Sequence, residues 1–288
     1  MVRKTSDIIF DFIVYFSLIF SCICILFPLL YVVSVSLTPY AEVIKNGGFM
    51  VIPRKITFES YILFFKESRL PRAYMVTIFI TVIGTFLNLL FTTTLAYPLS
   101  RKNLPGKNKI LFMIFFTMLF SGGTIPTYLV VKFIGLLNSV WAMIIPGLVN
   151  TYNLLIMKNF FANIDESLFE AARIDGAGET RVLVQIVLPL SKAILSTIGL
   201  YYGVAHWNQY YSAIMYIDDS DIQPLQIVLR QFLAGSENDI TKYNPDIEVA
   251  PESLKMTAVI LTALPVLIVY PFLQKYFTQG VMLGSIKG

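Results

Sequence analysis

The stretch FIVYFSLIFSCICILFPLLYVVSVSL, residues 12–37, contains no Lys, Arg, Asp or Glu. It is 26 residues long, whereas about 20 apolar helical residues are enough to cross the ~30 Å core of a lipid bilayer. A secretory signal peptide has a shorter apolar segment, of about 7–15 residues, followed by a small-residue cleavage site. The stretch therefore predicts an uncleaved membrane-spanning helix.

Five further charge-free runs follow, and every Lys, Arg, Asp and Glu lies outside the six runs. A single charged side chain at the centre of a span costs about 2.5–3.5 kcal/mol on insertion. Only 14% of the residues are charged, against about 25% in a typical soluble domain. We therefore expect an all-α integral membrane protein whose single domain, residues 1–288, crosses the bilayer six times, at about 12–37, 75–99, 110–131, 139–157, 193–215 and 256–275.

The basic residues indicate the orientation of these spans. With the N-terminus inside, the cytoplasmic segments hold twelve basic and seven acidic residues, and the outer segments hold ten basic and eleven acidic residues. The positive-inside bias then places both termini in the cytoplasm of a bacterial cell, although the segment 38–72 carries six basic residues outside.

Glycine and proline interrupt several of the predicted spans, including Pro28, Pro98, Gly122, Gly123 and Pro146. Such breaks are tolerated in a membrane only where protein or water satisfies the released backbone groups. They predict a water-lined passage or a packed bundle. After the glycine pair, residues 124–137 are expected to form a short amphipathic segment at the outer surface.

The predicted cytoplasmic loop 158–192 has the pattern of two short helices joined at Gly176. Ser167 and Glu170 have the spacing of a capping box that would begin the first helix. Glycine at 176 suits the left-handed conformation that ends many helices. A second helix is expected from Glu179 toward Leu188, with Pro189 breaking it.

This loop resembles the coupling signature of ABC import permeases, which is Glu-Ala-Ala, three residues, Gly, nine residues, Ile, one residue, Leu-Pro. Every position of that pattern is filled, by Glu170, Ala171, Ala172, Gly176, Ile186, Leu188 and Pro189. The alternative is an amphipathic helical hairpin resting on the membrane surface. Further stretches, such as 121–128 and 206–208, are similar to carbohydrate permeases of the maltose-importer superfamily, and most of all to the branch that handles complex oligosaccharides released from polysaccharides.

The resemblance implies that the loop docks on a separate ATPase subunit and transmits its closure to the spans. Glu170 would pair with a basic group of the ATPase, Gly176 would permit the turn, and Ala177 would allow close docking. Asp175 would brace the second helix, or would simply be solvated. The other implied partners are a second, different but homologous permease, two ATP-binding subunits or a homodimeric ATPase, an extracellular solute-binding protein and a carbohydrate. ATP and Mg would bind the ATPase, with no cofactor or metal on this chain.

The fifth predicted span carries the only histidine, His206, beside aromatic and amide side chains. Aromatic rings stack on sugars and amides bond to hydroxyls, so we expect a substrate path here. The alternative is an interfacial aromatic belt with a histidine bonded to a neighbouring helix. The candidates are His206, Trp207, Asn208, Tyr210, Tyr211 and, from the second span, Asn88, for which interhelical bonding is the other role considered.

Several function classes find little support in the sequence. No phosphate-binding loop of the form GxxxxGK[ST] is present, and no basic patch with interleaved aromatics indicates nucleic-acid binding. A membrane-embedded enzyme would need a carboxylate beside His206, and an ion-coupled secondary transporter usually carries charged residues within its spans. An ABC permease for a non-sugar solute also stays open. The acidic outer loop 218–252 is either a contact for a binding protein or a solvated loop.

Overall fold

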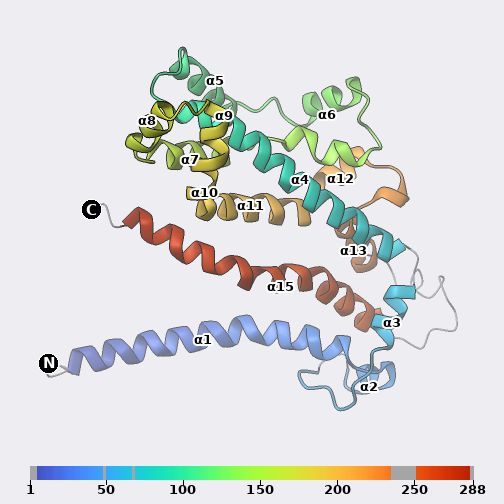
Figure 1. Cartoon of the computed structure of the whole chain (residues 1–288). Helices are drawn as coiled ribbons and strands as arrows, with labels where there is room; N and C mark the ends of the chain where they lie inside the picture. Colours follow the sequence, from blue (N-terminus) through green and yellow to red (C-terminus); the bar gives the residue numbers. More distant parts are fainter. Residues whose placement is uncertain (1–4, 48–49, 67–68, 235–250, 286–288) are drawn as a thin grey trace. The chain divides into compact units, whose positions relative to one another are not determined.

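A computed structural model describes residues 5–47, 50–66, 69–234 and 251–285, and these residues form helices and no strand (Figure 1). The helical content agrees with the expected all-α class. The chain divides into two compact units, residues 1–70 with 229–264 and residues 71–228 with 265–288.

The first unit contains α1 (Thr5–Ser36), α2 (Tyr40–Lys45), α3 (Glu59–Lys66) and the beginning of α15 (Pro251–Ser285). Most of α1 is exposed, and stacked phenylalanines such as Phe12 and Phe16 lie on its surface. Among the side chains of α1 that the structure describes, the buried ones are Ser34, Val35 and Ser36 at its C-terminal end, where the Ser36 and Tyr61 hydroxyls lie 2.9 Å apart. The part of α1 from residue 12 onward carries no charged residue, and its exposed apolar surface suits a lipid environment.

The second unit holds most of the remaining elements. In chain order they are α4 (Arg69–Ser100), α5 (Lys107–Leu119), α6 (Thr124–Phe133), η1 (Val140–Met143), η2 (Ile145–Gly147), α7 (Thr151–Ala162), α8 (Glu166–Ile174), α9 (Glu179–Val182), η3 (Leu183–Val187), α10 (Leu188–Leu190), α11 (Lys192–Trp207), α12 (Tyr211–Tyr216), η4 (Ser220–Ile222) and the start of α13 (Leu225–Ala234).

The core of this second unit lies where α4, α7 and α11 meet. Leu99, Met157 and Ile198 are buried there. A polar tie joins α4 to α11, because the Thr92 and Tyr202 hydroxyls lie 2.8 Å apart. A bonded polar pair inside an apolar core fixes one arrangement of the two helices, since an alternative packing would leave both hydroxyls unsatisfied.

Three helical segments are long and apolar enough to cross a membrane by themselves: Ile9–Ser36, Arg69–Ser100 and Glu252–Pro271. Three bent helix pairs also qualify if each pair crosses once: α5 with α6, η1 and η2 with α7, and Glu179–Leu190 with α11. Up to six spans are therefore available by length and composition. The six-span topology and its boundaries stay a prediction.

The glycine pair produces the bend expected after the third run. Helix α5 ends at Leu119 and α6 begins at Thr124, and the two axes differ by 115°. Gly123 has φ of 88°, which a residue with a side chain rarely adopts. The predicted span 110–131 therefore contains a sharp bend and is not one straight helix.

Candidate functional site

The coupling loop, residues 158–192, begins its first helix earlier than the sequence suggested. Asp165 is the N-cap of α8, and its carboxylate accepts a hydrogen bond of 3.0 Å from the Ser167 N–H. The prediction that Ser167 and Glu170 form a capping box is therefore wrong. An aspartate suits this position well, because its negative charge also interacts favourably with the helix N-terminus.

Gly176 ends α8 in the predicted way. Its φ is 73°, its N–H donates to the Arg173 carbonyl at 3.0 Å, and the Ala177 N–H donates to the Ala172 carbonyl at 2.9 Å. These two bonds form a Schellman motif, which satisfies the last carbonyls of the helix. Asp175 is exposed, and its side chain has no hydrogen-bond partner among the described residues, which matches the solvated alternative.

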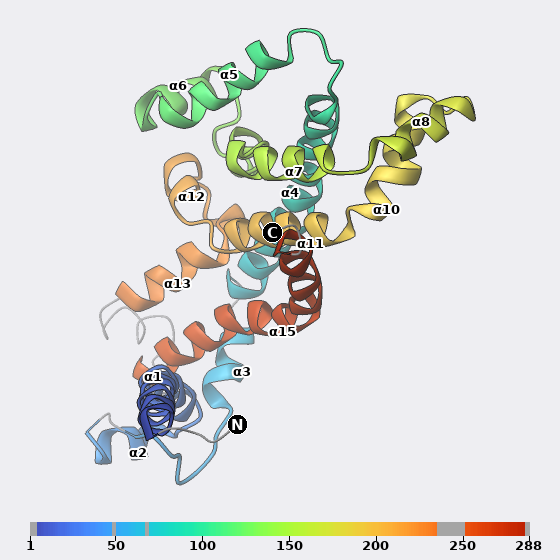
Figure 2. The same cartoon turned by 90° about the vertical axis from the view of Figure 1, so that its left-hand side faces the viewer.

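The second helix begins at Glu179 as expected but passes through Pro189. A π-helical turn, Leu183–Val187, precedes the proline, and the chain bends by 84° at Ser191 before α11 begins (Figure 2). The break predicted at Pro189 therefore falls one residue later, after Leu190. Proline lacks an N–H and crowds the preceding turn, and a wider turn accommodates both effects.

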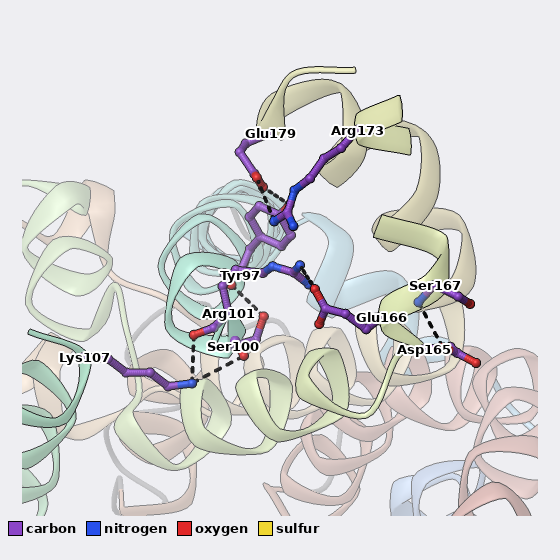
Figure 3. Close-up of polar contacts among 9 residues, drawn as sticks. All are labelled: Tyr97, Ser100, Arg101, Lys107, Asp165, Glu166, Ser167, Arg173 and Glu179. Carbon is purple, nitrogen blue, oxygen red and sulfur yellow. Dashed lines mark hydrogen bonds and ion pairs between the residues drawn. The ribbon is translucent and has the colours of Figure 1, made fainter. Parts of the chain in front are cut away.

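Two carboxylates of the loop are held by the C-terminal end of α4 (Figure 3). The Tyr97 hydroxyl donates to Glu179, and the Arg101 guanidinium donates to Glu166 at 2.7 Å. Arg173 adds a longer contact of 3.5 Å to Glu179. The tyrosine hydrogen bond, with Arg173 beside it, holds the pKa of the Glu179 carboxyl below its usual value, so Glu179 is ionised near neutral pH.

Arg101 also makes a cation–π contact with the loop. Its guanidinium carbon lies 3.6 Å from the ring centroid of Phe169, which is 2% exposed. Such a cation–π contact contributes about 1–2 kcal/mol when partly desolvated. At the same end of α4, Lys107 donates to the carbonyls of Ser100 and Arg101, which have no partner within the helix (Figure 3). The loop is therefore anchored on α4 by both charge and packing.

The other face of the coupling loop is exposed. Glu170, Ala171 and Gly176 lie on it, whereas Ala172 is buried and Ala177 is half-buried. Ile186 and Leu188 are also half-buried, and Pro189 is exposed. Ile174, an apolar side chain that is 87% exposed at the end of α8, was not among the predicted coupling residues. Its signal was an isoleucine directly before the Asp-Gly turn.

A cavity of about 730 Å³, lined mostly by side chains with polar groups, lies elsewhere in the second unit, between α4, α6, η1, η2, α7, α11 and α12. His206 and Asn88, both candidates for the substrate path, line it. The His206 Nε2 and the Asn88 Oδ1 are 2.7 Å apart, and the Asn88 amide donates to the carbonyls of Gly147 and Leu148 at 2.8 and 2.9 Å. Because the Asn88 nitrogen donates twice, its oxygen faces the histidine, and Nε2 carries a proton.

Comparisons with known proteins identify the family. A family model described as a binding-protein-dependent transport system inner membrane component matches residues 1–283. The chain belongs to this family. The observed helical fold and the filled coupling signature agree with that membership.

Individual members of the family and one solved structure are similar to this permease over most of its length. It is 42% identical to the polygalacturonan/rhamnogalacturonan transport system permease protein YtcP of Bacillus subtilis (strain 168), over 97% of this chain and 99% of the relative. It is 44% identical to Protein LplC of the same organism, over 91% and 89%. A chain in the crystal structure of a bacterial ABC transporter involved in the import of the acidic polysaccharide alginate superposes with a TM-score of 0.91, at 31% identity, covering 96% of this chain and 99% of that one.

These findings confirm the resemblance to carbohydrate permeases and the fold class. They also confirm that the chain is a transport permease rather than an enzyme, because the family and the relatives are transport permease components. The family description places it in an inner membrane, as part of a system that depends on a binding protein.

The permease does not bring all of the predicted path residues together. Trp207 is buried against Tyr74, with ring centroids 6.4 Å apart, and Tyr211 is exposed with its hydroxyl 3.1 Å from that of Thr124. The Asn208 amide donates to the Val204 carbonyl at 3.0 Å. Of the six predicted path residues, only His206 and Asn88 line the cavity, and Trp207, Asn208, Tyr210 and Tyr211 do not.

The cavity of this permease is also lined by residues that were not predicted from the sequence. The start of α7 contributes Asn150, Tyr152 and Asn153. The turn of α11 before His206 contributes Tyr201 and Tyr202. The available signal was the clustering of tyrosine and asparagine in residues 150–153, which lie within a charge-free run. Their position opposite α11 depends on long-range packing and has no local signature.

Proposed function

We propose that this chain is one of two permease subunits of an ATP-driven importer of oligosaccharides derived from polysaccharides. The second permease is a homologous chain, two ATP-binding subunits dock on the cytoplasmic face, and an extracellular binding protein delivers the sugar. Both termini and the coupling loop lie in the cytoplasm of a bacterial cell, and six spans cross its membrane. The coupling loop transmits closure of the ATPase to the spans. The residues that we assign to this role are Glu170, Ala171, Ala172, Asp175, Gly176, Ala177, Ile186, Leu188 and Pro189.

One observation carries this proposal. One side of the coupling loop is attached to the end of α4, through Glu166, Phe169 and Glu179. The other side, with Glu170, Ala171 and Ile174, is exposed. A lever needs a firm attachment to the part that it moves and a surface on which another body can act. The relatives named as sugar permeases support a carbohydrate as the substrate.

The alternative of a membrane-embedded enzyme gains no support from the surroundings of His206. The ring nitrogens face the amide oxygens of Asn88 and Gln209, at 2.7 and 3.5 Å, and not a carboxylate. An amide cannot accept a proton from the histidine as a carboxylate can. Retained sugar uptake by a His206→Ala importer would remove the remaining basis for that alternative.

Glu170→Lys tests the docking role of the loop. Glu170 is exposed and has no partner among the described residues, so the substitution should leave the unfolding temperature of the permease unchanged. We expect the ATPase to dissociate during purification through a tag on this chain, and sugar-stimulated ATP hydrolysis to fall at least about tenfold, which corresponds to 1.4 kcal/mol of docking energy.

The matched control is Glu59→Lys, a charge reversal at an exposed position of α3. Because α3 lies on the outer side in the proposed topology, that variant should behave like the unmodified importer. An importer carrying Glu170→Lys that retains its ATPase and its transport rate would contradict the proposed docking.

A further inference from the structure

The polar cavity contains side chains that are already bonded. Asn88 and His206 bond to each other, and the Gln209 amide donates to the Met143 carbonyl at 2.7 Å. The Tyr202 hydroxyl lies 2.8 Å from that of Thr92 and accepts a hydrogen bond of 3.0 Å from the Asn150 N–H. These groups hold α4, α7, α11 and the turn before α7 together, and they have little bonding capacity left for a ligand.

Asn153 differs from these residues. It lines the cavity in the first turn of α7 and is 6% exposed as a whole residue, and its carboxamide makes no hydrogen bond to the described residues. Beside it, the Asn150 oxygen caps α7 by accepting from the Asn153 N–H at 3.1 Å, which leaves the Asn150 amide nitrogen unbonded. A carboxamide that faces a cavity without a protein partner can bond to water or to a ligand, so Asn153 and the exposed Asn150 indicate a position for a hydroxyl-rich ligand or for water.

Aromatic rings lie in the same cavity. Tyr201 and Tyr152 line it and are 46% and 58% exposed, and neither hydroxyl has a partner among the described residues. A tyrosine ring can stack on the apolar face of a pyranose while its hydroxyl bonds to the sugar. A volume of about 730 Å³ is within the usual range of small-molecule sites.

The lining includes no Asp, Glu, Lys or Arg side chain. A carboxylate bound among these residues would find no arginine or lysine with which to form an ion pair. Hydroxyl groups need no such partner, because amide and phenol groups replace water as their partners. The chemistry of the lining thus favours uncharged sugar units over uronates.

We propose that this cavity is a binding site for uncharged hexopyranose units of the transported oligosaccharide. The Asn153 carboxamide donates to one hydroxyl and accepts from its neighbour, and Tyr201 stacks on the ring. Asn88 and His206 position the helices and do not touch the sugar. The inference rests on the proposed function and assigns to it a site and a substrate class.

The test uses the intact importer, purified through a tag on this chain and reconstituted in liposomes with its binding protein. The probes are labelled neutral hexose oligosaccharides and, separately, oligogalacturonides. We expect uptake of neutral oligosaccharides, and a rate at saturating sugar that falls about tenfold in Asn153→Ala. Asn159→Ala is the matched control, because Asn159 lies on the exposed side of the same helix. In the Asn159→Ala control, uptake, basal ATP hydrolysis and the unfolding temperature should match those of the unmodified importer.

Tyr201 provides a second measurement if Asn153→Ala fails to assemble. Tyr201→Phe should keep most of the uptake, and Tyr201→Ala should lose about tenfold. Uptake that is unchanged in both the Asn153 and the Tyr201→Ala variants overturns the site and leaves the proposed function intact. Uptake of oligogalacturonides alone overturns the substrate class. An unmodified importer that carries no sugar at all overturns the proposed function, and the inference with it.

Discussion

Replacement of Arg101 by alanine should uncouple ATP hydrolysis from sugar transport. Arg101 joins α4 to the coupling loop twice, through its 2.7 Å bond to Glu166 and its position 3.6 Å from the Phe169 ring centroid. Its side chain is 13% exposed and that of Glu166 is 40% exposed, so the ion pair is only partly screened by water. With the cation–π contact, we expect a loss of about 2 kcal/mol in the attachment of the loop.

A loop that is less firmly attached moves without carrying α4 with it. The number of ATP molecules hydrolysed per sugar imported should therefore rise severalfold in Arg101→Ala, and amide hydrogen exchange in residues 165–175 should accelerate. Arg101→Lys should be intermediate, because lysine keeps the charge but lacks the flat guanidinium group. Lys102→Ala is the matched control, since Lys102 is exposed and has no partner among the described residues. A normal ratio of ATP to sugar in Arg101→Ala would show that α4 does not receive the movement of the loop through this residue.

Local sequence signals were enough to predict the fold class and the helix end at Gly176 in the coupling loop. A run such as residues 12–37 predicts a membrane helix because the energetic cost of a buried charge acts on each segment separately. Gly176 was predictable for a similar reason, because a left-handed helix end requires a residue without a side chain, whatever surrounds it.

Competing local signals explain the errors within the loop. Asp165 and Ser167 are both good N-cap residues by type, and the structure uses Asp165. The passage of the helix through Pro189 depends on the π-helical turn at Leu183–Val187, for which no simple spacing rule exists.

The contacts that α4 makes with the coupling loop and with α11 were not predictable from the spacing of residues. Tyr97 and Glu179 are 82 positions apart, and Asn88 and His206 are 118 apart. Both members of each pair look ordinary in the sequence, and only the packing of α4 against the loop and α11 brings them together. The histidine was noticed because it is alone in a charge-free run, and its bonding to a neighbouring helix was one of the two roles considered.

Gly84→Ala should destabilise the permease although alanine is the better helix former. A Cβ at Gly84 would lie 2.6 Å from the His206 Nε2 and 2.8 Å from its Cε1, closer than atoms in contact can be. The ring has little freedom to move away, because Nε2 is bonded to Asn88 and the other ring nitrogen faces Gln209. Overpacking costs about 1–3 kcal/mol and a lost hydrogen bond about 1 kcal/mol, against a gain of at most about 1 kcal/mol in helix propensity.

The control for Gly84→Ala is Gly203→Ala on the facing helix α11. A Cβ at Gly203 would meet the Thr85 hydroxyl at 3.6 Å, an ordinary contact, so this variant should keep or raise the unfolding temperature of the purified importer, while Gly84→Ala lowers it by several degrees. In a His206→Ala background the clash is absent, and Gly84→Ala should cost little more. Equal losses with and without His206 would mean that the close approach of α4 to this ring does not determine how the two helices pack.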